Sequence, residues 1–162
     1  MNLHKVFLLL GSNLGDREQM LQSAEDAITG HEIETIQRSG LYETAAWGIT
    51  DQPAFLNQVL EVETKLDPEA LMQTLLEIEQ SLGRERKERY GPRSIDIDIL
   101  FFDTLVYHSS VVTIPHPAMQ ERKFVLKPLA ELAPDLIHPV FHQSVQELLS
   151  QCKDELPVKK IS

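Results

Sequence analysis

The sequence contains almost no cysteine and no long apolar run. Cys152 is the single cysteine among 162 residues, which excludes an internal disulfide and a cysteine-based zinc site. No apolar run approaches the ~20 residues that a membrane helix needs. Residues 1–10 carry one short apolar stretch without a small-residue cleavage site, so we expect no secretory signal. A reducing, cytoplasmic compartment is therefore expected.

Basic residues are also scarce. Fifteen Lys and Arg stand against 25 Asp and Glu, which gives a formal net charge of −10. Because such a chain repels the phosphates of nucleic acids and anionic membranes, we expect it to bind neither. The length and the 42% apolar content suit one domain with one core. We expect a single domain over residues 1–162, with a frayed polar tail at about 153–162, and a monomer.

Hydrophobic patterning predicts the order strand, helix, strand, strand, helix, strand. The strands are expected at residues 5–10, 32–44, 55–64 and 95–103, and the helices at 16–30 and 67–83. Asp16 and Asp67 are suitable N-caps, and Gly30 and Gly83 are suitable helix ends. This order is typical of an α+β, ferredoxin-like βαββαβ core with an antiparallel sheet. A C-terminal hairpin at 106–114 and short helices at 124–133 and from Ser144 are expected to follow.

The basic residues that are present are concentrated in one segment. Five of the 15 fall within ten residues: Arg84, Arg86, Lys87, Arg89 and Arg93. Only Glu85 and Glu88 oppose them, so the local charge is +3. The segment is either an ordinary solvated loop or a clamp for phosphate oxygens, which arginine forks bind well.

Two aspartates follow this segment on a predicted strand. In residues 95–99 isoleucine and aspartate alternate, so the isoleucines face the core and Asp96 and Asp98 share the opposite face. At ~7 Å between their Cα atoms, the two carboxylates repel by about 2 kcal/mol at an effective dielectric of 20. A cation between them relieves this, and hard oxygen ligands favour Mg²⁺ over zinc. The alternative is a strand with a wet face.

Glu79 lies on the apolar face of the second predicted helix, inside the arc that includes Leu71, Leu76 and Ile78. A carboxylate there costs free energy unless it is paired or faces a polar site. It either reaches an arginine beyond the helix end or stands on the wall of an active site.

Several short motifs lie in order between residues 5 and 150. They are Gly11-Ser12-Asn13-Leu14-Gly15, Tyr42-x-Thr44, residues 51–57, Gly83-Arg84-x-Arg86, residues 89–100, Pro115-His116 and Arg122-x-Phe124. Residues 89–100 join the basic segment to the aspartate pair. Together the motifs resemble those of the 6-hydroxymethyl-7,8-dihydropterin pyrophosphokinase family of the folate pathway.

The resemblance implies transfer of a whole pyrophosphate group from ATP to the pterin hydroxymethyl group, with release of AMP. It implies catalytic roles for Arg84, Arg93, Asp96 and Asp98, the two aspartates holding two Mg²⁺ ions. It implies ATP contacts from Arg86, Arg89, Tyr90, Ile99, Thr113, His116 and Arg122. It implies a pterin pocket formed by Thr44, Trp47, Phe55, Asn57 and Phe124, with Glu79 nearby.

The residues themselves leave some alternatives open. A Mg²⁺-dependent nucleic-acid enzyme and a non-catalytic ferredoxin-like binding module also fit an aspartate pair on such a sheet. Asp98 is a candidate to accept the hydroxyl proton, and loss of that proton to solvent is the alternative. Residues 45–53 and 84–93 are expected to be mobile lids because both are loop-like and would close on substrate.

Overall fold

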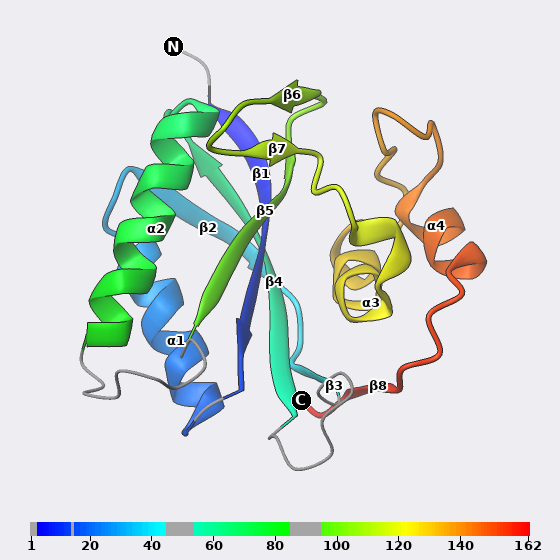
Figure 1. Cartoon of the computed structure of the whole chain (residues 1–162), viewed down its shortest axis with the longest axis horizontal. Coiled ribbons are helices and arrows are strands. Elements are labelled where there is room, and N and C mark those ends of the chain that lie inside the picture. Colours follow the sequence, from blue (N-terminus) through cyan, green and yellow to red (C-terminus); the bar gives the residue numbers. More distant parts are fainter. Residues whose placement is uncertain (1–2, 14, 45–53, 85–94) are drawn as a thin grey trace.

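The computed structural model describes residues 3–13, 15–44, 54–84 and 95–162. In this part of the chain a twisted sheet separates two helical layers, with α1 and α2 on one face and α3 and α4 on the other (Figure 1). The elements are β1 (His4–Ser12), α1 (Arg17–Ile28), β2 (Ile33–Arg38), β3 (Tyr42–Thr44), β4 (Phe55–Thr64), α2 (Pro68–Arg84), β5 (Asp96–Phe102), β6 (Tyr107–His108), β7 (Thr113–Ile114), a 3₁₀ turn (Met119–Glu121), α3 (Lys123–Leu132), α4 (Val145–Gln151) and β8 (Val158–Lys160).

The main sheet has the order β5-β1-β4-β3-β8, with β2 also paired to β4. Every pair in it is antiparallel. The first strand of the chain, β1, therefore lies between β4 and β5, the third and fourth strands of the βαββαβ pattern, and the predicted ferredoxin-like α+β class is confirmed. The predicted hairpin is confirmed as the β6–β7 pair.

The predicted N-caps Asp16 and Asp67 are confirmed by their hydrogen bonds. The Asp16 carboxylate accepts a hydrogen bond from the Gln19 N–H, and the Asp67 carboxylate accepts one from the Ala70 N–H. Ser144 begins α4 with a reciprocal capping box, as its spacing from an acid three residues later predicts. None of the helices in the described part of the chain is both long and apolar enough to span a bilayer.

The single strand expected over residues 32–44 is divided into β2 and β3. Ser39 lies at the break, where its N–H donates to the Val59 carbonyl and its hydroxyl accepts from the Val59 N–H. The bend lets β2 follow the distal half of β4 while β3 follows its beginning. Thr44 is thereby carried to the end of the sheet where β4 starts.

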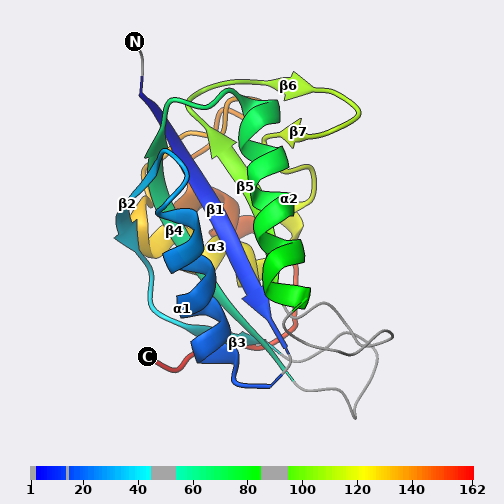
Figure 2. The same cartoon turned by 90° about the vertical axis from the view of Figure 1, so that its left-hand side faces the viewer.

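The two faces of the sheet have separate cores. Even-numbered apolar residues of β1 and β4 and the isoleucines of β5 pack under α1 and α2, which lie side by side on that face (Figure 2). Residues of the other face, such as Leu9, Val59 and Phe101, pack against α3 and α4. Ile95, Ile97 and Ile99 are all buried, as their alternation with aspartate predicts.

The C-terminal segment is ordered, so the expectation of a frayed tail is wrong for residues 158–160. They form β8, an edge strand that pairs with β3. The Ile161 N–H also donates to the Leu41 carbonyl. The segment is polar in composition, but its backbone hydrogen bonds come from a strand more than a hundred residues away, which no local pattern reveals.

Glu131 of α3 fastens this edge of the sheet to the helical layer. Its carboxylate accepts hydrogen bonds from the Tyr42 hydroxyl (2.6 Å) and the Gly40 N–H (3.1 and 3.2 Å) and lies 3.2 Å from the Lys160 ammonium. Burial by itself would raise the pKa of Glu131, but these hydrogen bonds and the lysine charge outweigh it, and the pKa is lowered. Burial and the bond to Glu131 raise the pKa of Tyr42.

Replacing Glu131 by glutamine should therefore destabilise the fold by about 1–3 kcal/mol, since charge-assisted hydrogen bonds are lost. Because the folded-state pKa of Glu131 is lowered, its contribution is complete above the ordinary value of 4.5 and is lost as the pH falls through the lowered value. Urea unfolding of wild type and Glu131→Gln at several pH values measures this. The control is Glu34→Gln, on an exposed carboxylate of β2, which should change the free energy of unfolding little. If the stability difference between wild type and Glu131→Gln widened as the pH fell, the assignment would be contradicted.

Candidate active site

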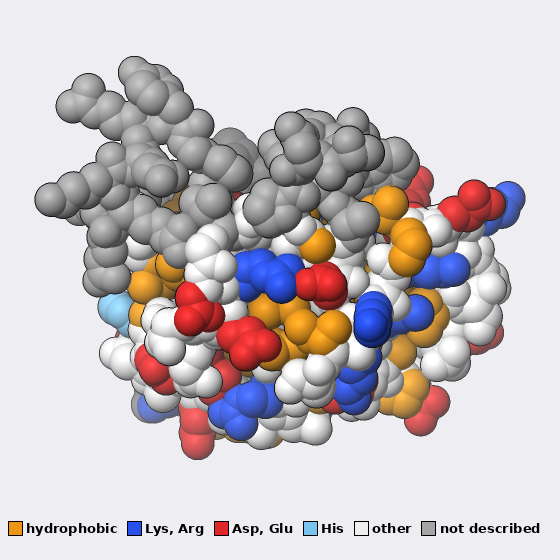
Figure 3. Space-filling model, turned by 90° about the horizontal axis from the view of Figure 1, so that it is seen from below, with side chains coloured by type: hydrophobic (Ala, Val, Ile, Leu, Met, Phe, Trp, Pro, Cys, Tyr) orange, Lys and Arg blue, Asp and Glu red, His pale blue; other side chains and the backbone are white. Residues whose placement is uncertain are grey.

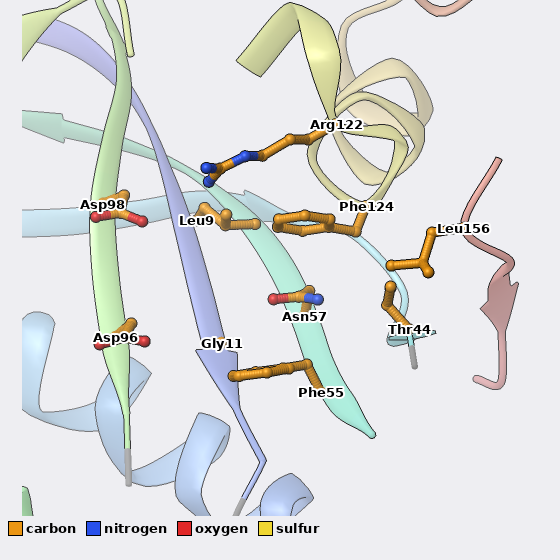
Figure 4. A pocket seen from close by; sticks show the side chains of 10 residues that line it. All are labelled: Leu9, Gly11, Thr44, Phe55, Asn57, Asp96, Asp98, Arg122, Phe124 and Leu156. Carbon is orange, nitrogen blue, oxygen red and sulfur yellow. The ribbon is translucent and has the colours of Figure 1, made fainter. Parts of the chain in front are cut away.

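A pocket of about 220 Å³ opens on the face of the sheet away from α1 and α2. Strands β5, β1, β4 and β3 form its floor, and the start of α3 and the segment before β8 form its side (Figure 4). Its lining residues are Leu9, Gly11, Thr44, Phe55, Asn57, Asp96, Asp98, Arg122, Phe124 and Leu156.

The register of three strands sets the pocket floor. Gly11 of β1 pairs with Asp96 on one side and with Asn57 on the other. A Cβ atom at Gly11 would lie 2.7 Å from the Asn57 side-chain oxygen, which is closer than such atoms approach. Glycine at this position therefore lets the amide lie over bare backbone between the aspartates and the aromatic residues.

The two aspartates project from β5 into one end of the pocket (Figure 4). Both are partly exposed, and the expectation that they share the face opposite the isoleucines is confirmed. Within the described ranges no group of three His, Cys, Asp or Glu side chains is arranged to hold a metal ion. Two carboxylates alone fit Mg²⁺, which binds proteins through one or two carboxylates and takes its remaining oxygens from water and phosphate.

Two further groups stand at this end of the pocket. Arg122, just before α3, extends its guanidinium toward the side on which Asp98 lies (Figure 4). The Nδ1 atom of His116 accepts a hydrogen bond from the Ala118 N–H, which leaves the proton of the neutral ring on Nε2. Burial lowers the pKa of His116, the Asp98 charge opposes this, and Arg122 lowers it further. A neutral imidazole donor and a cation therefore accompany the carboxylates.

Aromatic rings and unpartnered polar atoms occupy the other end. In Figure 4 the Asn57 amide lies between the rings of Phe55 and Phe124. The Asn57 amide nitrogen and the Thr44 hydroxyl are buried and have no hydrogen-bond partner within the described residues. Arg122 also lies 5.8 Å from the Phe124 ring centre, within cation–π range. Such orphaned polar groups beside aromatic faces suit a flat ring that carries its own donors and acceptors.

The pocket brings together many of the residues expected from the sequence. Those that line it are Asp96, Asp98, Arg122, Thr44, Phe55, Asn57 and Phe124. His116 lies beside it. Arg84 ends α2, and its side chain lies outside the described residues, as do Trp47, Arg86, Arg89, Tyr90, Arg93 and both expected lids.

Besides His116, three expected residues are not among the lining residues. The Ile99 side chain is buried in the core under α1 and α2, and the Thr113 hydroxyl pairs with the His108 ring in the hairpin. The Glu79 carboxylate accepts a hydrogen bond from the Ile97 N–H at 2.7 Å. β5 is an edge strand, so this N–H has no neighbouring strand, and the carboxylate on the apolar helix face satisfies it.

The pocket is also lined by Leu9, Gly11 and Leu156. The sequence patterns indicated no individual role in a site for any of them. Gly11 belongs to the opening glycine motif, and the close approach of Asn57 is what requires it. Leu9 belongs to a buried strand, and Leu156 to the segment expected to fray. Nothing local in the sequence indicates that either reaches a pocket.

The fold and the pocket define the chain as a ferredoxin-like α+β protein whose pocket has two carboxylates at one end and aromatic and buried polar side chains at the other. Residues 7–134 match the family described as 7,8-dihydro-6-hydroxymethylpterin-pyrophosphokinase, or HPPK. The chain belongs to this family.

The relatives agree with this assignment. The chain is 41% identical over 148 residues to a 2-amino-4-hydroxy-6-hydroxymethyldihydropteridine pyrophosphokinase of Methylorubrum extorquens, covering 91% of this chain and 92% of that protein. It is 45% identical to the folic acid synthesis protein fol1 of Schizosaccharomyces pombe over 96% of this chain, but spans only 21% of that protein.

A solved structure shows the same fold. The HPPK-DHPS protein of Plasmodium falciparum superposes with a TM-score of 0.75 at 16% identity, over 93% of this chain and 45% of that chain.

Thr44→Val should stabilise the ligand-free protein by about 1 kcal/mol, because it removes a buried hydroxyl without a partner and keeps its shape. The matched control is Thr64→Val. The Thr64 hydroxyl donates to the Glu32 carbonyl and accepts from the Leu66 N–H, so its loss should destabilise. Urea unfolding of both variants measures this, and equal destabilisation would show that the Thr44 hydroxyl is satisfied in the free protein.

Proposed function

We propose that the chain transfers pyrophosphate from ATP to the hydroxymethyl group of 6-hydroxymethyl-7,8-dihydropterin, giving AMP and the pterin diphosphate. The observation that carries this is one pocket in which the Asp96–Asp98 pair shares the lining with the Asn57 amide nitrogen and the Thr44 hydroxyl, which have no partner among the described residues. The first end suits a metal-bound polyphosphate, and the second suits a polar aromatic ring. The name of the Methylorubrum relative states the same activity.

At the ring end, Phe55 and Phe124 would cover the pterin, and Asn57 and Thr44 would read its hydrogen-bonding edge. Amide and hydroxyl groups that are already desolvated lose nothing further when a ligand supplies partners. They would also reject rings without matching groups. Trp47 is proposed to belong to this set.

At the phosphate end, Asp96 and Asp98 would hold Mg²⁺, as two ions, which would neutralise phosphate charge and orient the ATP chain. Arg84 and Arg93 are proposed to stabilise charge on the transferring group. ATP contacts are proposed from Arg86, Arg89, Tyr90, Ile99, Thr113, His116 and Arg122. Because the Ile99 side chain is buried in the core, its contact would come from the backbone.

In the reaction, the hydroxymethyl oxygen would attack the β-phosphorus. The bond from that phosphorus to the oxygen that bridges it to the α-phosphorus would break, and AMP would leave with the electron pair. The hydroxyl proton would pass to Asp98 or to solvent. The contribution of the chain is therefore mainly positioning and electrostatic stabilisation.

We also propose that the protein acts in the cytoplasm as a monomer on small molecules rather than on nucleic acid or membranes. The net charge of −10 supports the exclusion of nucleic acid and anionic membranes. The described surface seen from below mixes acidic, basic and hydrophobic side chains without a continuous basic stretch among them (Figure 3). A polyanion gains affinity from an extended basic surface.

Replacing either aspartate by asparagine should lower kcat by about 10²–10³-fold, because the carboxylates that hold the metal and phosphates are lost. AMP formation from ATP, Mg²⁺ and the hydroxymethyl pterin measures this, with circular dichroism to verify folding. Asp103→Asn is the control, since Asp103 follows the opposite end of β5 and bonds His4 and Lys5. Release of ADP alone, or no turnover of pterin, would refute the function.

Variants at the two ends of the pocket should change the KM values of different substrates. Asn57→Ala should raise the KM for pterin by about 10–100-fold, the equivalent of one or two buried hydrogen bonds, and leave the KM for ATP nearly unchanged. Arg122→Ala should do the reverse. Steady-state kinetics with each substrate varied at saturating levels of the other tests this. Equal effects of either variant on both KM values would contradict the division of the pocket.

A further inference from the structure

The C-terminal segment supplies a wall of the pocket. Leu156 lines it together with Thr44, at the end away from the aspartate pair (Figure 4). This residue lies beyond residues 7–134, the part that matches the family. A side chain from outside the matched part therefore borders the recess in which the ring would lie.

One carboxylate links Leu156 to the start of α3. Asp154 accepts a hydrogen bond from the Leu156 N–H at 3.0 Å through one oxygen and from the Lys123 N–H at 3.1 Å through the other. Lys123 stands between Arg122 and Phe124, which both line the pocket. Asp154 thus fixes two walls of the pocket relative to each other without lining it.

The residues after Leu156 are held against the sheet. Val158 pairs with Thr44, and Lys160 pairs with Tyr42; the Val158 carbonyl also accepts a hydrogen bond from the Lys127 ammonium. Gly40 leaves room for the chain end, since a Cβ there would lie 2.3 Å from the Ser162 carbonyl oxygen and 2.6 Å from the Lys160 side chain. The strand that carries Thr44 and the strand that follows Leu156 are therefore joined directly.

We propose that residues 154–162 form a strap that completes the pterin recess, in which Leu156 contacts the ring and Asp154 is a positioning residue. This rests on the proposed function. Leu156 sets the size of the recess at the end away from the phosphates. Its apolar side chain would pack on the ring and exclude alkyl substituents on the edge of the ring opposite the hydroxymethyl group.

Leu156→Ala should raise the pterin KM about tenfold, because a buried aliphatic contact is lost, and leave the ATP KM unchanged. It should also reduce discrimination against a pterin that is N-methylated on its exocyclic amine, measured as the ratio of kcat/KM values. Asp154→Ala should raise the pterin KM in the same direction, and Asp154→Asn, which keeps one acceptor oxygen, should fall between it and wild type. Gly40→Ala, which crowds the strap from outside the pocket, should also raise the pterin KM.

The control is Ile36→Ala, on β2 and outside the strap and the pocket, with a 42% exposed side chain; its KM values should match wild type. A purely structural role would lower the unfolding midpoint of the variants without separating the two KM values. If wild type turns over pterin and Leu156→Ala keeps both KM values and the selectivity ratio, the strap is refuted and the function stands. If wild type turns over no pterin, the proposed function fails, and the strap proposal fails with it.

Discussion

The pairing of β1 with both β4 and β5 is the constraint on which the site depends. β1 lies between these strands, so its register fixes Asp96 and Asn57 on either side of Gly11. The absence of a side chain at Gly11 then lets the Asn57 amide approach the backbone. The same strand buries Leu8 and Leu10 under α1 and α2. A slip of one residue would exchange the two faces and destroy core and site together.

The edge position of β5 explains why Glu79 lies on the apolar face of α2. Its Ile97 N–H faces away from β1 and would lack a partner, and the Glu79 carboxylate from α2 supplies one. That N–H lies between the two aspartates along the strand. Glu79 therefore ties the backbone that carries both carboxylates to the longest helix, from the face opposite the pocket. A residue can support the aspartate pair in this way without lining the site.

The elements that the sequence predicted correctly depend on residues close together in the chain, and the elements that it missed depend on contacts between distant residues. Alternation at residues 95–99 and the caps Asp16, Asp67 and Ser144 depend on neighbours a few positions away, so these elements could be recognised directly. The division into β2 and β3 depends on Ser39 bonding Val59, and β8 depends on pairing with β3. The family resemblance named most lining residues, but neither it nor any pattern indicated Leu156. Its position follows from Asp154 and β8, which tertiary structure alone reveals.

The polar groups of the pocket are also where the fold gives up stability. Two carboxylates share one strand face, and the buried amide nitrogen of Asn57 and the hydroxyl of Thr44 lack partners in the described residues. Each of these costs of order 1–3 kcal/mol, while native domains are stable by only about 5–15 kcal/mol. Three side chains add stabilising hydrogen bonds around the pocket: Glu79 of α2 bonds β5, Glu131 of α3 bonds Gly40 and Tyr42, and Asp154 joins α3 to the strap. All three are carboxylates that accept backbone N–H groups of the elements they join. The acidic residues that give the chain its net charge of −10 thus include groups that hold the walls of the pocket in place.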